Sequence, residues 1–252
     1  MKRKVTEIFG RFDPARLRVH WDGPIAEPEL RMAGDLNGIF ARKGCSASGP
    51  LYAMFRDLAK SAADRWWMRE NHLRYDITVI PPRVICGEFV KTKGHFHPKN
   101  RAGVGYPEIY EVLEGTAHYL LQREDTTDVV LVVAATGDVV VVPPGYGHVT
   151  INPTTDHVLH MANIVSSRFT SDYAKYVDKK GAAYYEMADG SWVKNRAYEK
   201  VPPLRCVDAG RVKTPDAGLQ FPLYRHIARR DPVLGFLNSP EKFSCAADLR
   251  YP

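Results

Sequence analysis

The chain contains 252 residues, of which 44% are hydrophobic and 25% are charged. This composition excludes a disordered or fibrous protein, and the length allows one large domain or two small ones around a buried core. The 35 Lys and Arg residues outnumber the 29 Asp and Glu residues, which gives a formal net charge of +6. Because the basic residues form no dense stripe and no nucleic-acid motif is present, we expect no nucleic-acid partner.

The cysteine pattern bears on the compartment. The four cysteines are spaced too widely for a zinc clip and do not indicate a disulfide framework; they are Cys45, Cys86, Cys206 and Cys245. Scattered reduced thiols are typical of a cytoplasmic protein. No apolar signal segment follows the basic start, and the longest apolar run, Val129–Ala135, is far shorter than a membrane span. We therefore expect a cytoplasmic protein without a membrane partner.

The first eighty residues carry few regular patterns. Residues 1–50 are rich in Pro and Gly and predict turns, and Pro50–Arg56 alternates weakly as a strand does. The segment Ser61–Asp64 resembles a capping box and predicts a short helix that runs through Glu70. A strand is then predicted over Asp76–Pro81, where consecutive prolines end it.

Residues 84–165 have a different character, because short β-branched segments recur between Gly, Pro, Asn and Asp. The seven predicted strands are Val84–Thr92, Glu108–Leu113, Ala117–Gln122, Asp128–Ala134, Asp138–Val142, His148–Ile151 and His157–Val165. Seven short strands at roughly ten-residue spacing predict an all-β sandwich or barrel.

The remainder of the chain is predicted to be irregular. A hairpin turn is expected at Asp189-Gly190, within a region rich in aromatic residues. Residues 202–252 are rich in proline and show no long periodic run. We expect residues 1–200 to form one domain with an N-terminal elaboration, and residues 201–252 to form an extension that packs on the barrel or on a partner subunit.

The strongest chemical signal is a pair of histidines, His95 and His97. Residues i and i+2 of a strand point to the same face, so a strand here would place both imidazoles side by side. Imidazole is the commonest nitrogen ligand for first-row metals. On this pair alone, two surface histidines on a strand remain an equally valid interpretation.

Two later segments strengthen the metal interpretation. A glycine-led segment places Pro143, Gly145, His148 and Asn152 after Gly137, and this spacing matches the second signature motif of the cupin superfamily at every position. The first cupin motif is matched by the histidine pair and by a glutamate seven residues before a glycine. The gap between these two parts contains ten residues, whereas most cupins have three or four there.

The long gap leaves two glutamates as candidates for the fourth ligand. Glu111 lies three residues after Glu108 and so faces the opposite side of the strand, and the spacing to Gly115 favours Glu108. The expected ligand set is His95, His97, Glu108 and His148. Three imidazoles and one carboxylate suit Fe(II), Mn(II), Co(II), Ni(II) or Zn(II), and they leave coordination positions open for a substrate. A metal-free binding cupin is the alternative.

Three phrases of the sequence carry a closer resemblance. They are Thr-Lys-Gly-His-Phe-His from Thr92, Pro-Glu-Ile-Tyr-Glu-Val-Leu-Glu-Gly from Pro107, and Val-Pro-Pro-Gly-Tyr-Gly-His-Val-Thr-Ile-Asn from Val142. Together they closely resemble the archaeal-type, cupin glucose-6-phosphate isomerases, over residues 24 to 195 or thereabouts. The resemblance implies a double-stranded β-helix or jelly-roll barrel with a short N-terminal helix, and a homodimer. It also implies interconversion of glucose 6-phosphate and fructose 6-phosphate in glycolysis and gluconeogenesis.

The same resemblance implies a cofactor and the residues that bind the sugar phosphate. One divalent metal per subunit is expected, with Fe(II) as the first choice and Mn(II), Ni(II), Co(II) and Zn(II) as alternatives. The phosphate contacts are expected at Tyr52, Thr78, Thr92 and Gly94, whose hydroxyls and backbone N–H are suitable donors. Lys93 adds charge nearby, although strand alternation directs it away.

Three residues are expected to serve catalysis. Glu108 would act as the base in an enediol route, whereas a metal-assisted hydride shift needs no such base, and the sequence does not separate the two. Tyr110 lies on the same strand face and would hydrogen-bond a sugar hydroxyl or relay a proton. Ser171-Asp172-Tyr173 occupies the place where the family has a His or Tyr near the substrate; Tyr173 matches, and the family's histidine is absent.

Two other classes of function remain open. The same ligands serve metal-dependent cupin dioxygenases and decarboxylases, in which iron or manganese is bound. A sugar-binding cupin without catalytic activity is the other class. The phosphate contacts distinguish the isomerase, because enzymes that use dioxygen have no need of them.

Overall fold

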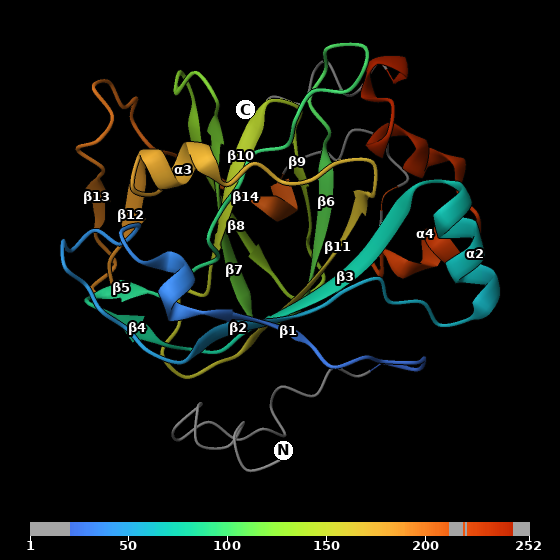
Figure 1. Ribbon diagram of the computed structural model, residues 1–252, viewed down its shortest axis with the longest axis horizontal. Coiled ribbons are helices and arrows are strands. Elements are labelled where there is room, and N and C mark those ends of the chain that lie inside the picture. The colour runs from blue at the N-terminus through green and yellow to red at the C-terminus, as the bar shows by residue number, and fades with distance from the viewer. Residues whose placement is uncertain (1–20, 212–218, 220, 244–252) are drawn as a thin grey trace.

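The computed structural model describes residues 21–211, 219 and 221–243 (Figure 1). The strands are β1 (Glu29–Met32), β2 (Pro50–Phe55), β3 (Leu73–Ile80), β4 (Val84–Ile85), β5 (Glu88–Phe89), β6 (Glu108–Glu114), β7 (Thr116–Arg123), β8 (Val129–Ala135), β9 (Val139–Val142), β10 (Tyr146–Ile151), β11 (Leu159–Ser166), β12 (Tyr184–Glu186), β13 (Trp192–Lys194) and β14 (Arg205–Asp208). The helices are α2 (Ala62–Glu70), α3 (Ala174–Asp178) and α4 (Tyr224–Ala228), with short 3₁₀ turns η2 (Ala33–Leu36), η3 (Ala209–Arg211), η4 (Pro232–Leu237) and η5 (Pro240–Lys242).

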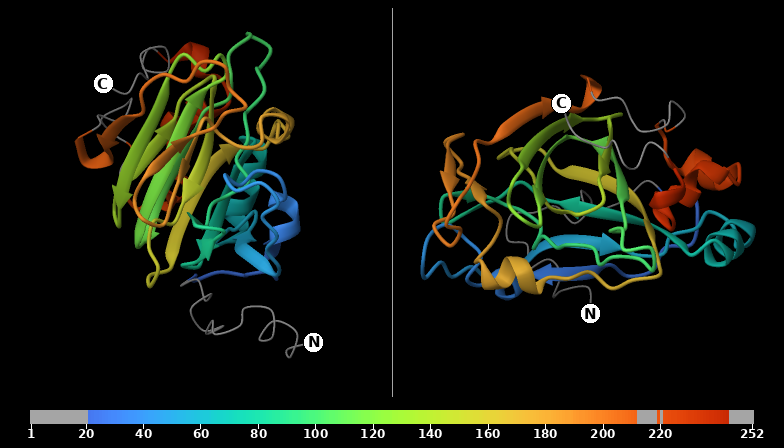
Figure 2. Two further views of the ribbon diagram at one scale, coloured as in Figure 1. Left: turned by 90° about the vertical axis from the view of Figure 1, so that its left-hand side faces the viewer. Right: turned by 90° about the horizontal axis from the view of Figure 1, so that it is seen from above.

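Two sheets face each other and form a barrel. One has the strand order β1-β2-β3-β11-β6-β9 and the other β10-β7-β8-β14. The pairs are antiparallel except that β14 runs parallel to β8. The sheets are the opposite walls of the barrel when it is seen from above (Figure 2). With 37% strand and 16% helix the chain is mostly β, which confirms the predicted fold class, although the two sheets do not close into one.

Most predicted elements are confirmed, and one is wrong. Strands β6 to β11 begin and end within two residues of their predictions, and α2 begins after Ser61, whose hydroxyl accepts the Asp64 N–H at 3.1 Å. The segment Val84–Thr92, predicted as one strand, instead forms a hairpin of β4 and β5. Cys86 and Gly87 occupy its turn with φ of 52° and 93°, and this left-handed backbone interrupts a strand.

The expectation of four reduced thiols is also wrong. A disulfide joins Cys45 to Cys86, with 6.0 Å between their Cα atoms, and ties the loop after η2 to the β4–β5 turn. The two cysteines are separated by 41 residues, so their proximity is not visible in the spacing. Cys206 is free and exposed, and Cys245 lies outside the described residues.

No helix within the described ranges combines the length and hydrophobicity that a membrane crossing requires.

The described part of the C-terminal segment packs on the outer face of the six-stranded sheet. Leu223, Ile227 and Leu234 are fully buried there, in one apolar cluster with the outward-facing residues of β3. The carboxylate of Glu111 on β6 accepts the Leu223 N–H at 2.6 Å and the Tyr75 hydroxyl at 3.0 Å. Glu111 therefore fastens this segment to the barrel.

Glu111 gives this contact a dependence on pH. Burial raises the pKa of Glu111 above its ordinary value, although the two hydrogen bonds favour the ionised form. An acid whose pKa is higher in the folded protein contributes stability at low pH and loses it as the pH rises through that value. We expect the melting temperature of Glu111→Gln, relative to the wild type, to increase as the pH rises above the ordinary glutamate pKa of about 4.3.

The matched control is Glu70→Gln, at an exposed glutamate of α2. Its melting temperature should follow that of the wild type across the same range. A difference between Glu111→Gln and the wild type that does not change with pH would contradict the assignment.

Candidate metal centre and cavity

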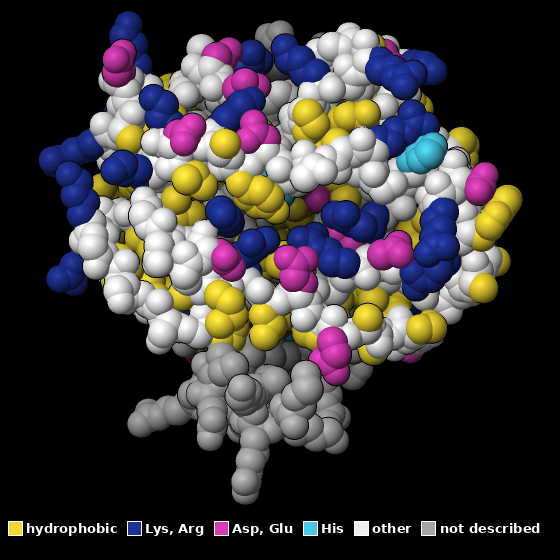
Figure 3. Space-filling view, viewed as in Figure 1, with side chains coloured by type: hydrophobic (Ala, Val, Ile, Leu, Met, Phe, Trp, Pro, Cys, Tyr) yellow, Lys and Arg dark blue, Asp and Glu magenta, His cyan; other side chains and the backbone are white. Residues whose placement is uncertain are grey.

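A cavity of about 440 Å³ opens between the two sheets. Its walls follow strand alternation, because Tyr52 of β2 and Arg56 just after it line the cavity, as do Arg74 and Thr78 of β3. Tyr75 and Ile77, which alternate with these residues on β3, face the outer apolar cluster instead. Figure 3 shows Lys and Arg side chains gathered around the hollow on the front face of the molecule.

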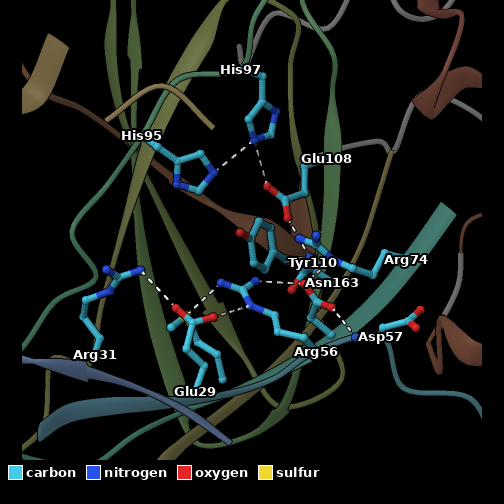
Figure 4. Close-up of polar contacts among 12 residues, drawn as sticks. Glu29, Arg31, Arg56, Asp57, Arg74, His95, His97, Glu108, Tyr110 and Asn163 are labelled. Atoms are coloured by element: carbon cyan, nitrogen blue, oxygen red, sulfur yellow. Dashed lines mark hydrogen bonds and ion pairs between the residues drawn. The ribbon is translucent and has the colours of Figure 1, made fainter. Parts of the chain in front are cut away.

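Four side chains meet in this cavity as a candidate metal centre. The ligand atoms of His95, His97, Glu108 and His148 all lie within 4.8 Å of one another. The Nε2 atoms of His95 and His97 are 3.1 Å apart, and Glu108 Oε2 lies 3.3 Å from His97 Nε2 and 3.4 Å from His148 Nε2. Figure 4 shows His95, His97 and Glu108 directed toward a common centre. All four predicted ligands are thus brought together.

Irregular backbone holds the histidine pair. His95 and His97 lie outside the regular strands, but His95 and His148 exchange two backbone hydrogen bonds of 3.2 and 3.1 Å. Gly94, with φ of 73°, turns the chain just before the pair. The ten-residue insertion folds back so that the carbonyl of Tyr106 accepts a hydrogen bond from His97 Nδ1 at 2.9 Å. This bond orients the ring with Nε2 toward the centre.

The glutamate ambiguity is resolved by the pleat of β6. Glu108 faces the cavity, and Glu111 faces the outer cluster, where it holds Leu223. Glu108 Oε1 accepts a hydrogen bond of 2.7 Å from Asn163 Nδ2, which fixes the carboxylate. Glu108 Oε2 is buried and has no hydrogen-bond partner among the described residues. A buried carboxylate oxygen without a donor, facing imidazole nitrogens, fits a cation as its partner.

The protonation states agree with metal binding. Burial lowers the pKa of His148 to about 4 and holds the pKa of His95 well below its ordinary value, so both rings are neutral at pH 7. Burial would raise the pKa of Glu108, but His97 and His148 beside it bring that pKa below its ordinary value. Neutral imidazoles and an ionised carboxylate are the forms that ligate a divalent metal.

The two tyrosines predicted to act in catalysis also line the cavity. The Tyr110 hydroxyl lies 3.0 Å from His148 Nε2, and burial raises the pKa of Tyr110 well above its ordinary value, so the phenol stays protonated. Tyr173 lies just before α3, with its ring centroid 5.4 Å from that of His95.

The four residues expected to contact phosphate line the same cavity. The Tyr52 hydroxyl accepts the Lys93 N–H at 3.1 Å, and Thr92 Oγ1 accepts the Thr150 N–H at 2.9 Å. Thr78 is buried on β3 and Gly94 precedes the histidine pair. The Lys93 ammonium lies 5.3 Å from the centroid of the Tyr173 ring.

Several charged residues of the cavity were not anticipated. Arg31, Arg56 and Arg74 line it, and Asp76 lies buried between Arg56 and Arg74. Strand alternation places Arg74, Asp76 and Thr78 on the same face of the strand. This alternation could have predicted that Arg74 and Asp76 lie on the cavity side. Asn163 was missed for lack of any motif, since its contact with Glu108 depends on the pairing of β11 with β6.

Comparison with known proteins identifies the family. Residues 31–203 match the family described as Glucose-6-phosphate isomerase (GPI). The chain is 33% identical over 127 residues to the glucose-6-phosphate isomerase of Thermococcus gammatolerans, a match that covers 50% of this chain and 63% of the relative. It is 34% identical over 112 residues to that of Pyrococcus furiosus, covering 44% of this chain and 56% of the relative.

The matches have a limited extent. Each spans less than two thirds of the relative's own length. A solved structure of vicilin from Capsicum annuum aligns with 58% of this chain and 32% of its own at a TM-score of 0.37 and 15% identity, which adds nothing to the family assignment. The family match extends over more than half of the chain. The chain therefore belongs to the glucose-6-phosphate isomerase family.

Proposed function

We propose that the protein is a metal-dependent aldose-ketose isomerase that interconverts glucose 6-phosphate and fructose 6-phosphate. The observation that carries this proposal is the cluster of His95, His97, Glu108 and His148 inside a cavity whose walls also bear the expected phosphate contacts. Membership of the family supports the substrate, and the cavity supports the chemistry.

The four clustered side chains would hold one divalent metal. When bound, such an ion acts as a Lewis acid that stabilises negative charge developing on the C1 and C2 oxygens of the sugar. Fe(II) is our first choice, on the resemblance of the motifs, and Mn(II), Ni(II), Co(II) and Zn(II) suit the same ligands.

Other residues that line the cavity would bind the phosphate group. The Thr78 and Thr92 hydroxyls, the Gly94 N–H and the Tyr52 hydroxyl would supply hydrogen bonds to its oxygens. Arg31 lies opposite Tyr52 in the β1–β2 register, and its buried Nε has no hydrogen-bond partner among the described residues. Arg31 would therefore supply positive charge, which the four predicted contacts lack.

Proton transfer would fall to Glu108 and the two tyrosines. Glu108 is ionised and is fixed by Asn163, so it would accept the C2 proton in the enediol route. In the hydride-shift route Glu108 would serve as a ligand alone. Tyr110 keeps its proton and would donate a hydrogen bond to a sugar hydroxyl, and Tyr173 would contact the sugar from the α3 side.

Conversion of fructose 6-phosphate to glucose 6-phosphate, measured before and after EDTA treatment, tests the proposal. We expect EDTA to abolish turnover and one added divalent ion to restore it, because the four ligand side chains come from this chain alone. Absence of turnover with every metal would overturn the proposal. Oxygen consumption or decarboxylation would then favour another cupin enzyme, and sugar binding without turnover would favour a binding protein.

Role, assembly and location follow from the same proposal. We propose a place in glycolysis and gluconeogenesis, a homodimer and a cytoplasmic location. The disulfide between Cys45 and Cys86 removes the thiol argument for the cytoplasm, so that part rests on the metabolic role alone.

A further inference from the structure

A second cavity, of about 500 Å³, lies where three irregular segments of the chain meet. The ten-residue insertion after His97 contributes Arg101 and Tyr106, the segment after β11 contributes Arg168, and the C-terminal segment contributes Glu241. Figure 1 shows the insertion, the green loop at the top of the view, beside the red C-terminal turns. Small-molecule sites have volumes of about 300–1,000 Å³, so this second cavity has room for an organic ligand.

Two arginines on different segments give the second cavity an excess of positive charge. The guanidinium groups of Arg101 and Arg168 make no hydrogen bond, ion pair or aromatic contact with any residue that the structure describes. The carboxylate of Glu241, in the same wall, accepts a hydrogen bond of 2.8 Å from Asn100 Nδ2. A phosphate monoester carries a charge of about −1.5 to −2 at pH 7, which two guanidinium groups match.

The walls of the second cavity are connected to the candidate metal centre through His97. The Tyr106 carbonyl accepts the hydrogen bond of His97 Nδ1 at 2.9 Å, and the Tyr106 ring stacks on Phe169 with 4.8 Å between the centroids. Phe169 directly follows Arg168, and its ring centroid lies 4.5 Å from that of His97. A ligand that bridges Arg101 and Arg168 would therefore fasten together the two segments that contact the His97 ring.

We propose that the second cavity binds an organic phosphate, and that the bound ligand stabilises the candidate metal centre by holding His97 in place. Binding there does not depend on the proposed function, because the described residues that line the two cavities are different. The effect on His97 rests on the proposed metal centre. The Ser239 hydroxyl and the Glu241 carboxylate line the same cavity and suit hydroxyl groups on the organic part of the ligand.

Titration calorimetry of the metal-loaded protein with three probes tests the binding site. The probes are inorganic phosphate, glycerol 3-phosphate and adenosine 5′-monophosphate, of which the last two carry an organic group with hydroxyls. We expect at least one organic probe to bind more tightly than inorganic phosphate. Arg101→Gln and Arg168→Gln should each weaken that probe by about 10-fold, the lower end of the range for a hydrogen bond to a charged group, because both side chains are exposed.

Two control variants separate the second cavity from the first. Arg31→Gln removes an arginine from the cavity of the candidate metal centre, and Arg196→Gln removes an exposed arginine that lines neither cavity. Both should leave this binding event unchanged. A probe that is weakened by Arg31→Gln and by neither Arg101→Gln nor Arg168→Gln would lie in the first cavity and overturn the proposal. Absence of binding by all three probes would also overturn it, and equal affinity for all three would overturn an organic ligand.

Competition between the protein and a chelator for Co(II) measures the effect on the candidate metal centre. We expect the organic probe to raise the Co(II) affinity of the wild type by about 5-fold or more, as coupled sites do. Arg168→Gln should remove this effect, whereas Phe169→Leu should keep the probe bound and lose the effect.

The outcomes separate the binding site from its coupling and from the proposed function. Binding of the probe without a change in Co(II) affinity would overturn the coupling to His97. Probe binding that depends on Arg101 and Arg168, in a protein without isomerase turnover, would support the second cavity and contradict the proposed function alone.

Discussion

Replacement of His148 by alanine is expected to remove the bound metal and to lower the isomerisation rate by at least about 100-fold. Loss of a group that only hydrogen-bonds to a metal ligand already lowers metal affinity or activity by about 10- to 100-fold. His148 is buried, and its Nε2 lies 3.4 Å from Glu108 Oε2 and 3.0 Å from the Tyr110 hydroxyl. The variant therefore removes an expected ligand and leaves a buried carboxylate oxygen with one fewer neighbour. Metal content per chain, determined by elemental analysis, and turnover of fructose 6-phosphate should fall together.

The matched control for this variant is His118→Ala. His118 belongs to β7 and contacts Glu186 at 2.9 Å, away from the residues that line the cavity. Its replacement should leave one metal per chain and near-normal turnover. A fully metal-loaded or fully active His148→Ala protein would remove His148 from the ligand set.

Gly94→Ala is expected to lower the free energy of unfolding by about 2–5 kcal/mol, from strain at a left-handed residue and from overpacking. Gly94 has φ of 73°, and a Cβ atom there would lie 2.5 Å from Val149 Cγ2 and 3.1 Å from the His148 carbonyl. Relief of this clash must move the chain that carries His95 away from β10. Turnover should therefore fall together with stability, because Gly94 both positions His95, an expected metal ligand, and is itself an expected phosphate contact.

A control variant at Gly137 separates the effect of the clash from the effect of the backbone conformation, because Gly137 also has a positive φ but has open space around it. Gly137 has φ of 93°, and a Cβ atom there would meet no heavy atom within 4 Å beyond its own chain neighbours. Gly137→Ala should lower the free energy of unfolding by only about 1–2 kcal/mol and leave turnover intact. Urea unfolding and the isomerase assay measure both variants. Equal effects of the two substitutions would show that backbone strain alone matters at Gly94.

The barrel strands were predictable because they are short and rich in β-branched residues, and because the turns between them are marked by Gly, Pro, Asn and Asp. The clustering of the four expected metal ligands followed from spacing alone, since the cupin motifs place these residues at fixed intervals around Gly137 and Gly115. The hairpin of β4 and β5 was missed because its turn residue Cys86 adopts a positive φ that its side chain does not suggest.

Contacts between distant segments account for what the sequence did not reveal. The disulfide depends on the approach of Cys45 to the β4–β5 turn, and the Glu111 contact depends on where Leu223 returns to the barrel. The arginine pair was missed for a different reason. Arg56 and Arg74 belong to no sequence motif. Their shared contact with Asp76 becomes visible only once the register of β2 and β3 is known.

Strand β3 serves two separate surfaces with alternate residues. Arg74 and Thr78 line the cavity, and Asp76 on the same face is buried against Arg74, whereas Tyr75 and Ile77 face the cluster that receives the C-terminal segment. A substitution at Arg74 can therefore change the cavity wall without touching the cluster that receives the C-terminal segment, and a substitution at Ile77 can change that cluster without touching the cavity wall. A protein engineer can treat the two faces of one strand as independent libraries.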